Sequence, residues 1–122
     1  VNVMMPTAYG DRKVLTPALH TQYKQVFPTP ASREPLHKLV KEMLDAGPFW
    51  AAQWKEVDRL RTIPTLIAWG MKDRFFPPDL LEKWRQALPH ATVRTFPEAG
   101  HFVHEEAPQE LVQAIRTFLI EH

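Results

Sequence analysis

The stretch PEAGHFVHEEAP, residues 97–108, brings two histidines and two glutamates close together. His101 follows an Ala-Gly pair, and imidazole is the side chain best suited to general-base chemistry near neutral pH. His104 lies three positions later beside Glu105, so the same stretch offers a trio of zinc ligands. A third interpretation is that Glu105 and Glu106 only begin a helix, whose dipole favours acidic residues in its first turn.

The surrounding residues argue against the metal site. Pro108 predicts that the helix begins at or after this position, which removes the helical spacing from His101 and His104. The HExxH order of zinc proteases is absent, and the chain has no cysteine to supply a thiolate ligand. We therefore expect no metal and no cofactor, and Glu105 and Glu106 are most simply interpreted as first-turn acids that a helix dipole favours.

The second half of the chain predicts the elements that position His101. Continuous apolarity over 63–69 (IPTLIAW) predicts a buried parallel strand, and alternation over 92–96 (TVRTF) predicts a second one. A helix is predicted after Pro77 and a final helix from Pro108. This order is a βαβ unit with a closing helix, and a right-handed crossover makes the two strands neighbours.

Asp73 lies in the loop that follows the first strand, and His101 follows the second. Because the carboxyl ends of parallel strands meet at one edge of a sheet, we expect these two side chains to face each other. A carboxylate beside an imidazole fixes its tautomer and stabilises the imidazolium. The order therefore predicts His101 as a base that Asp73 orients, against the alternatives that Asp73 only caps a turn and His101 only bonds to backbone.

The first half predicts helices separated by prolines. Residues 1–15 show no clear helix or strand periodicity and are expected to form a loop. A hydroxyl cap followed by proline at Thr16-Pro17 predicts a helix start, and Ser32 is expected to cap the next helix with Pro35 in its first turn. The predicted helices are 16–26, 32–46 and 49–60.

Two parallel strands alone make no viable sheet, because both edges and much of the two apolar faces stay exposed. The fold class is therefore α/β, with a sheet that is incomplete within this chain. We expect the tail of a larger α/β sheet, or a chain that pairs with another supplying the missing strands. The start at Val1 suggests a cut inside a longer chain.

Residues 61–122 resemble the C-terminal end of the α/β-hydrolase fold. IPTLIAWGMKDRFFPP is similar to the family's strand and acid loop, and FPEAGHFVHEEAPQELVQAIRTFL to its Gly-His loop and last helix. The segment RKVLT…YKQVFPTPASREPL resembles the stretch behind the helical cap in haloalkane dehalogenases and their epoxide-hydrolase relatives. The resemblance implies a C-terminal βαβα of the hydrolase core at 61–122, preceded by helical cap segments and a return to the core at 1–60.

The resemblance implies hydrolysis of a small apolar ester, epoxide or haloalkane through a covalent intermediate, with Asp73 and His101 as two members of the triad. The family's nucleophile elbow, Gly-x-Nuc-x-Gly, is missing, and the single serine, Ser32, has no glycine near it. We expect the N-terminal half of the hydrolase to supply it, on the same parent chain, a companion chain or a strand-swapped copy. The alternative is a non-catalytic, truncated hydrolase half that serves as a binding or assembly module.

Aromatic side chains flank the two loops of the predicted site. Phe75, Phe76 and Phe102 are expected to contact the apolar substrate and to wall the site against water. Three of the four tryptophans stand at core spacing on predicted helices, which favours a packing role for them.

The charge of the chain argues against several partners. Fifteen basic and fourteen acidic side chains leave a formal charge of +1, without the basic patch that nucleic acid or an anionic membrane selects. No apolar run approaches the roughly 18 residues of a membrane span, and the first ten residues lack the basic leader of a signal peptide. We expect a cytoplasmic protein that acts on a small apolar substrate.

Overall fold

The computed structural model describes all of residues 1–122. Its elements follow one another as α1 (Met4–Ala8), α2 (Pro17–Gln25), α3 (Pro30–Asp45), α4 (Gly47–Lys55), the 3₁₀ helix η1 (Val57–Thr62), β1 (Leu66–Gly70), α5 (Pro78–Ala87), β2 (Thr92–Phe96), α6 (Val103–Glu106) and α7 (Pro108–Glu121). Even the longest helix, α3, falls short of what would cross a bilayer.

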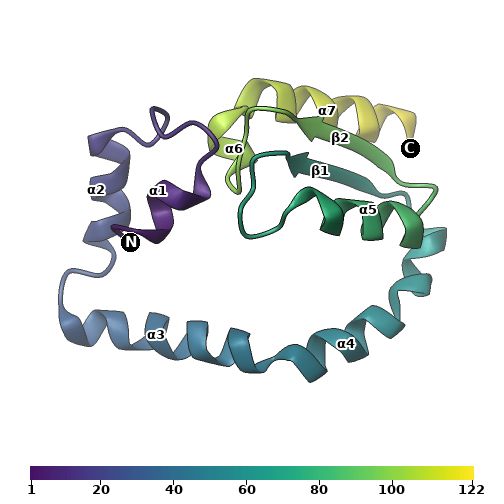
Figure 1. Ribbon diagram of the computed structural model, residues 1–122. Coiled ribbons are helices and arrows are strands. Elements are labelled where there is room, and N and C mark those ends of the chain that lie inside the picture. The colour runs from purple at the N-terminus through teal and green to yellow at the C-terminus, as the bar shows by residue number, and fades with distance from the viewer.

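The two strands form a parallel pair, in register from Leu66 opposite Thr92 to Gly70 opposite Phe96. Helix α5 makes the crossover between them, and α5 and α7 lie on opposite sides of the pair (Figure 1). The predicted βαβ unit with a closing helix is confirmed. A small apolar core lies between the sheet and the last helices; its members are Phe96, Ala99 and Val103, with Ala68, Ala107 and Leu111 packed against them.

The sheet is incomplete, as the sequence predicts. Only 10 of the 122 residues are buried, and the accessible surface is 8976 Å². A compact monomer of 14.2 kDa would expose about 6,800 Å². Many apolar side chains on the helices are exposed, and Leu44 and Ile120 are 81% and 85% exposed. Such surface is typical of a piece that belongs to a larger core.

The helices before β1 form an arc that leaves the carboxyl-terminal edge of the sheet and returns to the start of β1 (Figure 1). The predicted start of α2 is confirmed, because the Thr16 side chain accepts a hydrogen bond from the Leu19 N–H and Pro17 occupies the first position. The loop expected at 1–15 is wrong in part, since Met4–Ala8 forms a helical turn. Ala8 at its end is buried against the rest of the fold, and such contacts override weak local propensity.

Other boundaries differ from the prediction for local reasons. Thr29, not Ser32, caps α3, and the two side chains form a reciprocal capping box. Pro35 therefore lies inside the helix and not in its first turn. The third predicted helix divides into α4 and η1. The first strand begins at Leu66 instead of Ile63, because Pro64 between them has no N–H to donate to a ladder.

Candidate active site

The loops that follow β1 and β2 lie against each other at the carboxyl-terminal edge of the sheet. The Met71 N–H donates to the Phe96 carbonyl at 3.0 Å, and the Lys72 N–H donates to the Ala99 carbonyl at 2.9 Å. The Lys72 ammonium also pairs with the Glu98 carboxylate across the two loops. Each loop therefore fixes the other.

Glycine is required where the loops touch. A Cβ atom on Gly70 would lie 2.0 Å from the Gly100 carbonyl oxygen. A Cβ atom on Gly100 would lie 2.3 Å from the Ala8 carbonyl oxygen. These are steric demands, since no glycine has a positive φ. The backbone of the histidine loop, residues 97–102, is thus packed between the loop after β1 and the N-terminal segment.

Asp73 and His101 meet at this edge. The Asp73 Oδ2 atom lies 2.8 Å from His101 Nδ1, and Oδ1 accepts from the backbone N–H groups of Phe75 at 2.8 Å and Phe76 at 3.0 Å. Asp73 is only 9% exposed, whereas 30% of the His101 side chain is accessible. One Asp73 oxygen closes a turn and the other contacts the imidazole, so the side chain does not only cap a turn. Its role as the acid stays a prediction.

The pair is arranged as an acid–base unit requires. With Asp73 ionised, Nδ1 carries the proton that is donated to Oδ2, and Nε2 is left as the basic nitrogen. Nε2 has no hydrogen-bond partner within the chain. The arrangement can accept a proton at Nε2 while the buried carboxylate stabilises the resulting charge.

The three predicted substrate-contacting phenylalanines all lie against the His101 ring. The centroids of Phe75 and Phe102 are each 5.3 Å from it in edge-to-face geometry, and that of Phe76 is 5.2 Å away. Phe75 and Phe76 are 39% and 47% exposed, so they form an apolar rim open to the surroundings. Their rings shield the imidazole from water on several sides.

A cavity of about 160 Å³ borders the pair, and its lining includes Trp69, Phe76 and Val103. This volume is close to that of a cavity that holds a benzene molecule. Trp69, which lies on β1 and not on a helix, lines this cavity, and its Nε1–H donates to the Phe76 carbonyl at 3.2 Å.

The comparison with known families decides the affiliation. A family model described as the alpha/beta hydrolase fold matches residues 5–108. The chain belongs to the α/β-hydrolase family. Within this family its relatives include dehalogenase-like hydrolases, as the resemblance of its motifs implies.

Three relatives show how the similarity is distributed. Haloalkane dehalogenase 2 of Mycobacterium tuberculosis is 35% identical over 100 residues, which cover 80% of this chain and 35% of the relative. The cis-3-alkyl-4-alkyloxetan-2-one decarboxylase of Shewanella oneidensis is 42% identical over 59 residues, 48% of this chain and 19% of the relative. The sn-1-specific diacylglycerol lipase of Mus musculus is 36% identical over 56 residues, 46% of this chain and 18% of the relative. The aligned part thus spans between about a fifth and a third of these enzymes.

The structure of this α/β-hydrolase chain also shows contacts that sequence reasoning missed. Glu105 and Glu106 are not merely first-turn acids, because both bind the N-terminal segment. The hydroxyls of Tyr9 and Tyr23 donate to the two oxygens of Glu105. Burial, followed by the hydrogen bond to Glu105, raises the pKa of Tyr9 far above its usual 10.0. The pKa of Tyr23 is also raised, mainly by its own hydrogen bond to Glu105. No local pattern signals contacts between residues 82 and 96 positions apart.

His104 and Ser32, the candidates for a metal ligand and for a nucleophile, lie outside the Asp73–His101 pair. His104 lies 4.0 Å from Glu105 through Nε2, but Glu105 is occupied by the two tyrosines, and no group of three metal-binding side chains comes together. The Ser32 hydroxyl donates to the Thr29 carbonyl and accepts from its N–H, as part of the α3 cap. Ser32 therefore has a complete structural role at the start of a helix.

Proposed function

We propose that this chain supplies the acid and the base of a dehalogenase-like hydrolase, Asp73 and His101, and that the nucleophile lies outside residues 1–122. The observation that carries the proposal is the buried Asp73 carboxylate on His101 Nδ1, in an α/β-hydrolase chain and at the edge of the sheet where this architecture binds ligands.

The proposed reaction has two stages. An aspartate nucleophile forms a bond from its carboxylate oxygen to the substrate carbon as the bond to the leaving group breaks, which gives a covalent ester. A serine nucleophile would reach an ester by attack on the substrate carbonyl, with its hydroxyl proton passing to His101 Nε2 and from there to the leaving alcohol. His101 Nε2 then takes a proton from water as the water oxygen attacks the ester carbonyl, and Asp73 stabilises the imidazolium. Collapse of the tetrahedral intermediate releases the second product. For a haloalkane the net products are an alcohol, a halide ion and a proton.

A small apolar substrate fits the surroundings of His101. The Phe75, Phe76 and Phe102 rings offer an apolar wall around the imidazole. The name of the mycobacterial relative supports a haloalkane, and the name of the murine relative supports an ester. An aspartate nucleophile would favour haloalkane or epoxide, and a serine nucleophile would favour ester.

The nucleophile is proposed to come from the N-terminal half of the hydrolase, whether it precedes this segment in one polypeptide, forms a companion chain or comes from a strand-swapped assembly. The exposed apolar helices and the incomplete sheet support such a partner. The rival function is a non-catalytic binding or assembly module. It is supported by the absence of a nucleophile elbow from residues 1–122.

The test begins with the protein as its host cell makes it, purified through a tag on this segment together with everything joined or bound to it; we call this the native assembly. Mass spectrometry identifies the partner sequence and any Gly-x-Ser-x-Gly or Gly-x-Asp-x-Gly motif. Hydrolysis of 1-bromobutane, 1,2-epoxybutane and 4-nitrophenyl butyrate is then measured for the wild type, His101→Ala and His104→Ala.

We expect His101→Ala to reduce kcat by about 10²–10⁴-fold, while His104→Ala, which alters an exposed side chain, stays within a few-fold of wild type. If the nucleophile is aspartate, His101→Ala accumulates the alkyl ester, visible as the mass of one butyl group on the protein. Equal turnover by wild type and His101→Ala would refute the role of His101. An assembly with no nucleophile motif and no turnover would favour the binding module.

A further inference from the structure

We propose that Glu106 is a positioning residue for His101, a role that rests on the function proposed above. Glu106 ends α6 and does not touch the His101 ring. Its carboxylate instead connects the backbone of the histidine loop to that of the N-terminal segment. The bonds between Glu106 and the N–H groups of Gly10, Asp11 and Gly100 are called the Glu106 bridge below.

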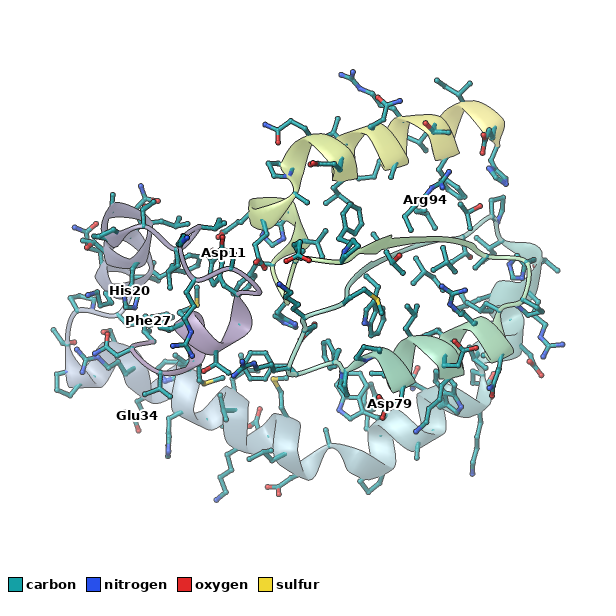
Figure 2. All side chains as sticks on the ribbon, turned by 45° about the horizontal axis from the view of Figure 1, so that its top comes forward. Asp11, His20, Phe27, Glu34, Asp79 and Arg94 are labelled. Carbon is teal, nitrogen blue, oxygen red and sulfur yellow. The ribbon has the colours of Figure 1, made fainter.

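The bridge uses both carboxylate oxygens. Oε1 accepts from the Gly100 N–H at 2.7 Å, directly before His101. Oε2 accepts from the Gly10 N–H at 2.8 Å and the Asp11 N–H at 3.0 Å. Figure 2 shows Asp11 on the part of the N-terminal arm that faces the short helix α6. Hydrogen bonds to an ionised acceptor are roughly twice as strong as neutral ones, so these three bonds form a firm connection.

A fourth hydrogen bond holds the backbone of His101 itself. The His101 N–H donates to the Ala8 carbonyl at 2.7 Å. The backbone N–H of His101 and that of the residue before it are therefore both held, one by Ala8 and one by Glu106. The opposite side of the loop is held by the Lys72 N–H, which donates to the Ala99 carbonyl and belongs to the loop that carries Asp73.

The close packing makes the position of the loop sensitive to this carboxylate. A Cβ atom on Gly10 would lie 2.2 Å from the Glu98 carbonyl oxygen, so the two backbones are in direct contact with no side chain between them. If the Glu106 bridge opens, the N–H groups of Gly10 and Gly100 lose their acceptor while packed together. The loop must then shift to regain partners, and His101 shifts with it relative to Asp73.

Neighbouring Glu105 offers a matched comparison. It belongs to the same helix and also holds the N-terminal segment, but through the side chains of Tyr9 and Tyr23 instead of the histidine loop. Loss of Glu105 loosens the attachment of that segment and leaves the bond at Gly100 in place. Glu110 on α7 is exposed and has no hydrogen bond or ion pair within the chain, so it controls for the loss of a negative charge.

The experiment compares Glu106→Gln, Glu105→Gln and Glu110→Gln in the native assembly. Glutamine keeps the shape of the side chain but presents an NH₂ group to at least one of the three N–H donors. The readouts are kcat and KM for the substrate that the wild type hydrolyses, and the NMR resonances of the His101 ring, whose Nδ1–H proton reports the bond to Asp73. The ring signal needs no turnover and therefore tests the Glu106 bridge independently of the proposed function.

We expect Glu106→Gln to lower kcat by up to about 100-fold with KM within about twofold, since misplacement near 1 Å has effects of this size. The Nδ1–H resonance of His101 should shift or broaden in Glu106→Gln only, and Glu110→Gln should match the wild type in both readouts. Wild-type values of kcat and ring signal in Glu106→Gln would overturn the proposal. So would a displaced ring signal with unchanged kcat, or an equal displacement in Glu105→Gln.

If Glu106→Gln does not fold, hydrogen exchange in the wild-type assembly decides. The Gly10 and Gly100 amides should exchange far more slowly than the first-turn amide of Asp79, which lies on the exposed start of α5 (Figure 2). Exchange of Gly100 as fast as Asp79 would show that the Glu106 bridge does not persist in solution and would overturn the proposal.

Discussion

Replacement of Asp73 by asparagine separates the electrostatic role of this side chain from its role in the loop. The amide oxygen of the asparagine can still accept from the N–H groups of Phe75 and Phe76, because both bonds go to the same oxygen in the native chain, Oδ1. The other substituent becomes an NH₂ group at the place of Oδ2, which lies 2.8 Å from His101 Nδ1. A donor there forces Nδ1 to be the unprotonated nitrogen, so the proton moves to Nε2.

The size of the effect follows from that change of tautomer. His101 with a proton on Nε2 cannot take one from water, and the imidazolium loses a carboxylate that is only 9% exposed. Positioned acid–base groups contribute about 10²–10⁴-fold, and a wrong tautomer has costs near the upper end. We expect kcat to fall by about 10³–10⁴-fold, which is about 4–5.5 kcal/mol of transition-state stabilisation. KM should change little, because the Phe75 and Phe76 backbone stays in place.

The assay measures kcat and KM in the native assembly for Asp73→Asn, Asp73→Ala and Asp79→Asn. Asp79 is an exposed aspartate with no side-chain partner, and its replacement controls for the loss of one charge. Asp73→Ala also removes the acceptor for the two loop N–H groups, so its KM should rise as well. The ¹⁵N resonances of the His101 ring report the tautomer directly. If Asp73→Asn retains kcat within about threefold of wild type, or keeps its ring proton on Nδ1, the acid–base reasoning is wrong.

Two further predictions concern the contacts behind the site. Because the pKa of Tyr9 is raised in the folded state, the folded state binds more protons than the unfolded state above about pH 10. The contribution of Tyr9 to the free energy of unfolding is therefore fully present below about pH 10 and falls as pH rises. Between about pH 9 and 11, urea denaturation should show about 1.4 kcal/mol more loss for wild type than for Tyr9→Phe, and equal losses would refute the assignment. Gly100→Ala places a Cβ 2.3 Å from the Ala8 carbonyl oxygen and should cost about 1–3 kcal/mol. Gly47→Ala, where nothing lies within 4 Å, should be neutral or stabilising by thermal unfolding; similar melting temperatures of the two variants would contradict the packing at Gly100.

Local rules predict the elements that carry Asp73 and His101. Alternation over 92–96 places β2 at its observed bounds, and the Thr16-Pro17 signal places the start of α2. The proximity of the loops that carry Asp73 and His101 follows from topology, because two neighbouring parallel strands must end at one edge. The catalytic roles of the two residues and the substrate contacts of the three phenylalanines stay predictions.

The remaining features depend on contacts that no local pattern encodes. Ser32 is a reasonable cap by its residue type, but the Thr29 side chain accepts from the Ser32 N–H and the Ser32 side chain accepts from the Thr29 N–H. This hydrogen-bonded pair makes Thr29 the cap. The Glu106 contacts with Gly10 and Asp11 span 96 and 95 positions. An acidic pair before a proline is equally compatible with a helix start and with a bridge to a distant backbone. Only the tertiary arrangement distinguishes the two.

The N-terminal segment therefore does more than lead into α2 and α3. Ala8 accepts a hydrogen bond from the histidine loop directly, and Gly10 and Asp11 are connected to it through Glu106. The loop that carries Asp73 holds the histidine loop from the other side. The position of a catalytic base on a loop depends on the position of the loop backbone. In this chain that backbone is fixed by a carboxylate from the following helix and by a carbonyl, that of Ala8, from a segment far earlier in the sequence. Loss of Ala8–Asp11 should then displace His101 even when Asp73 and the two strands remain intact.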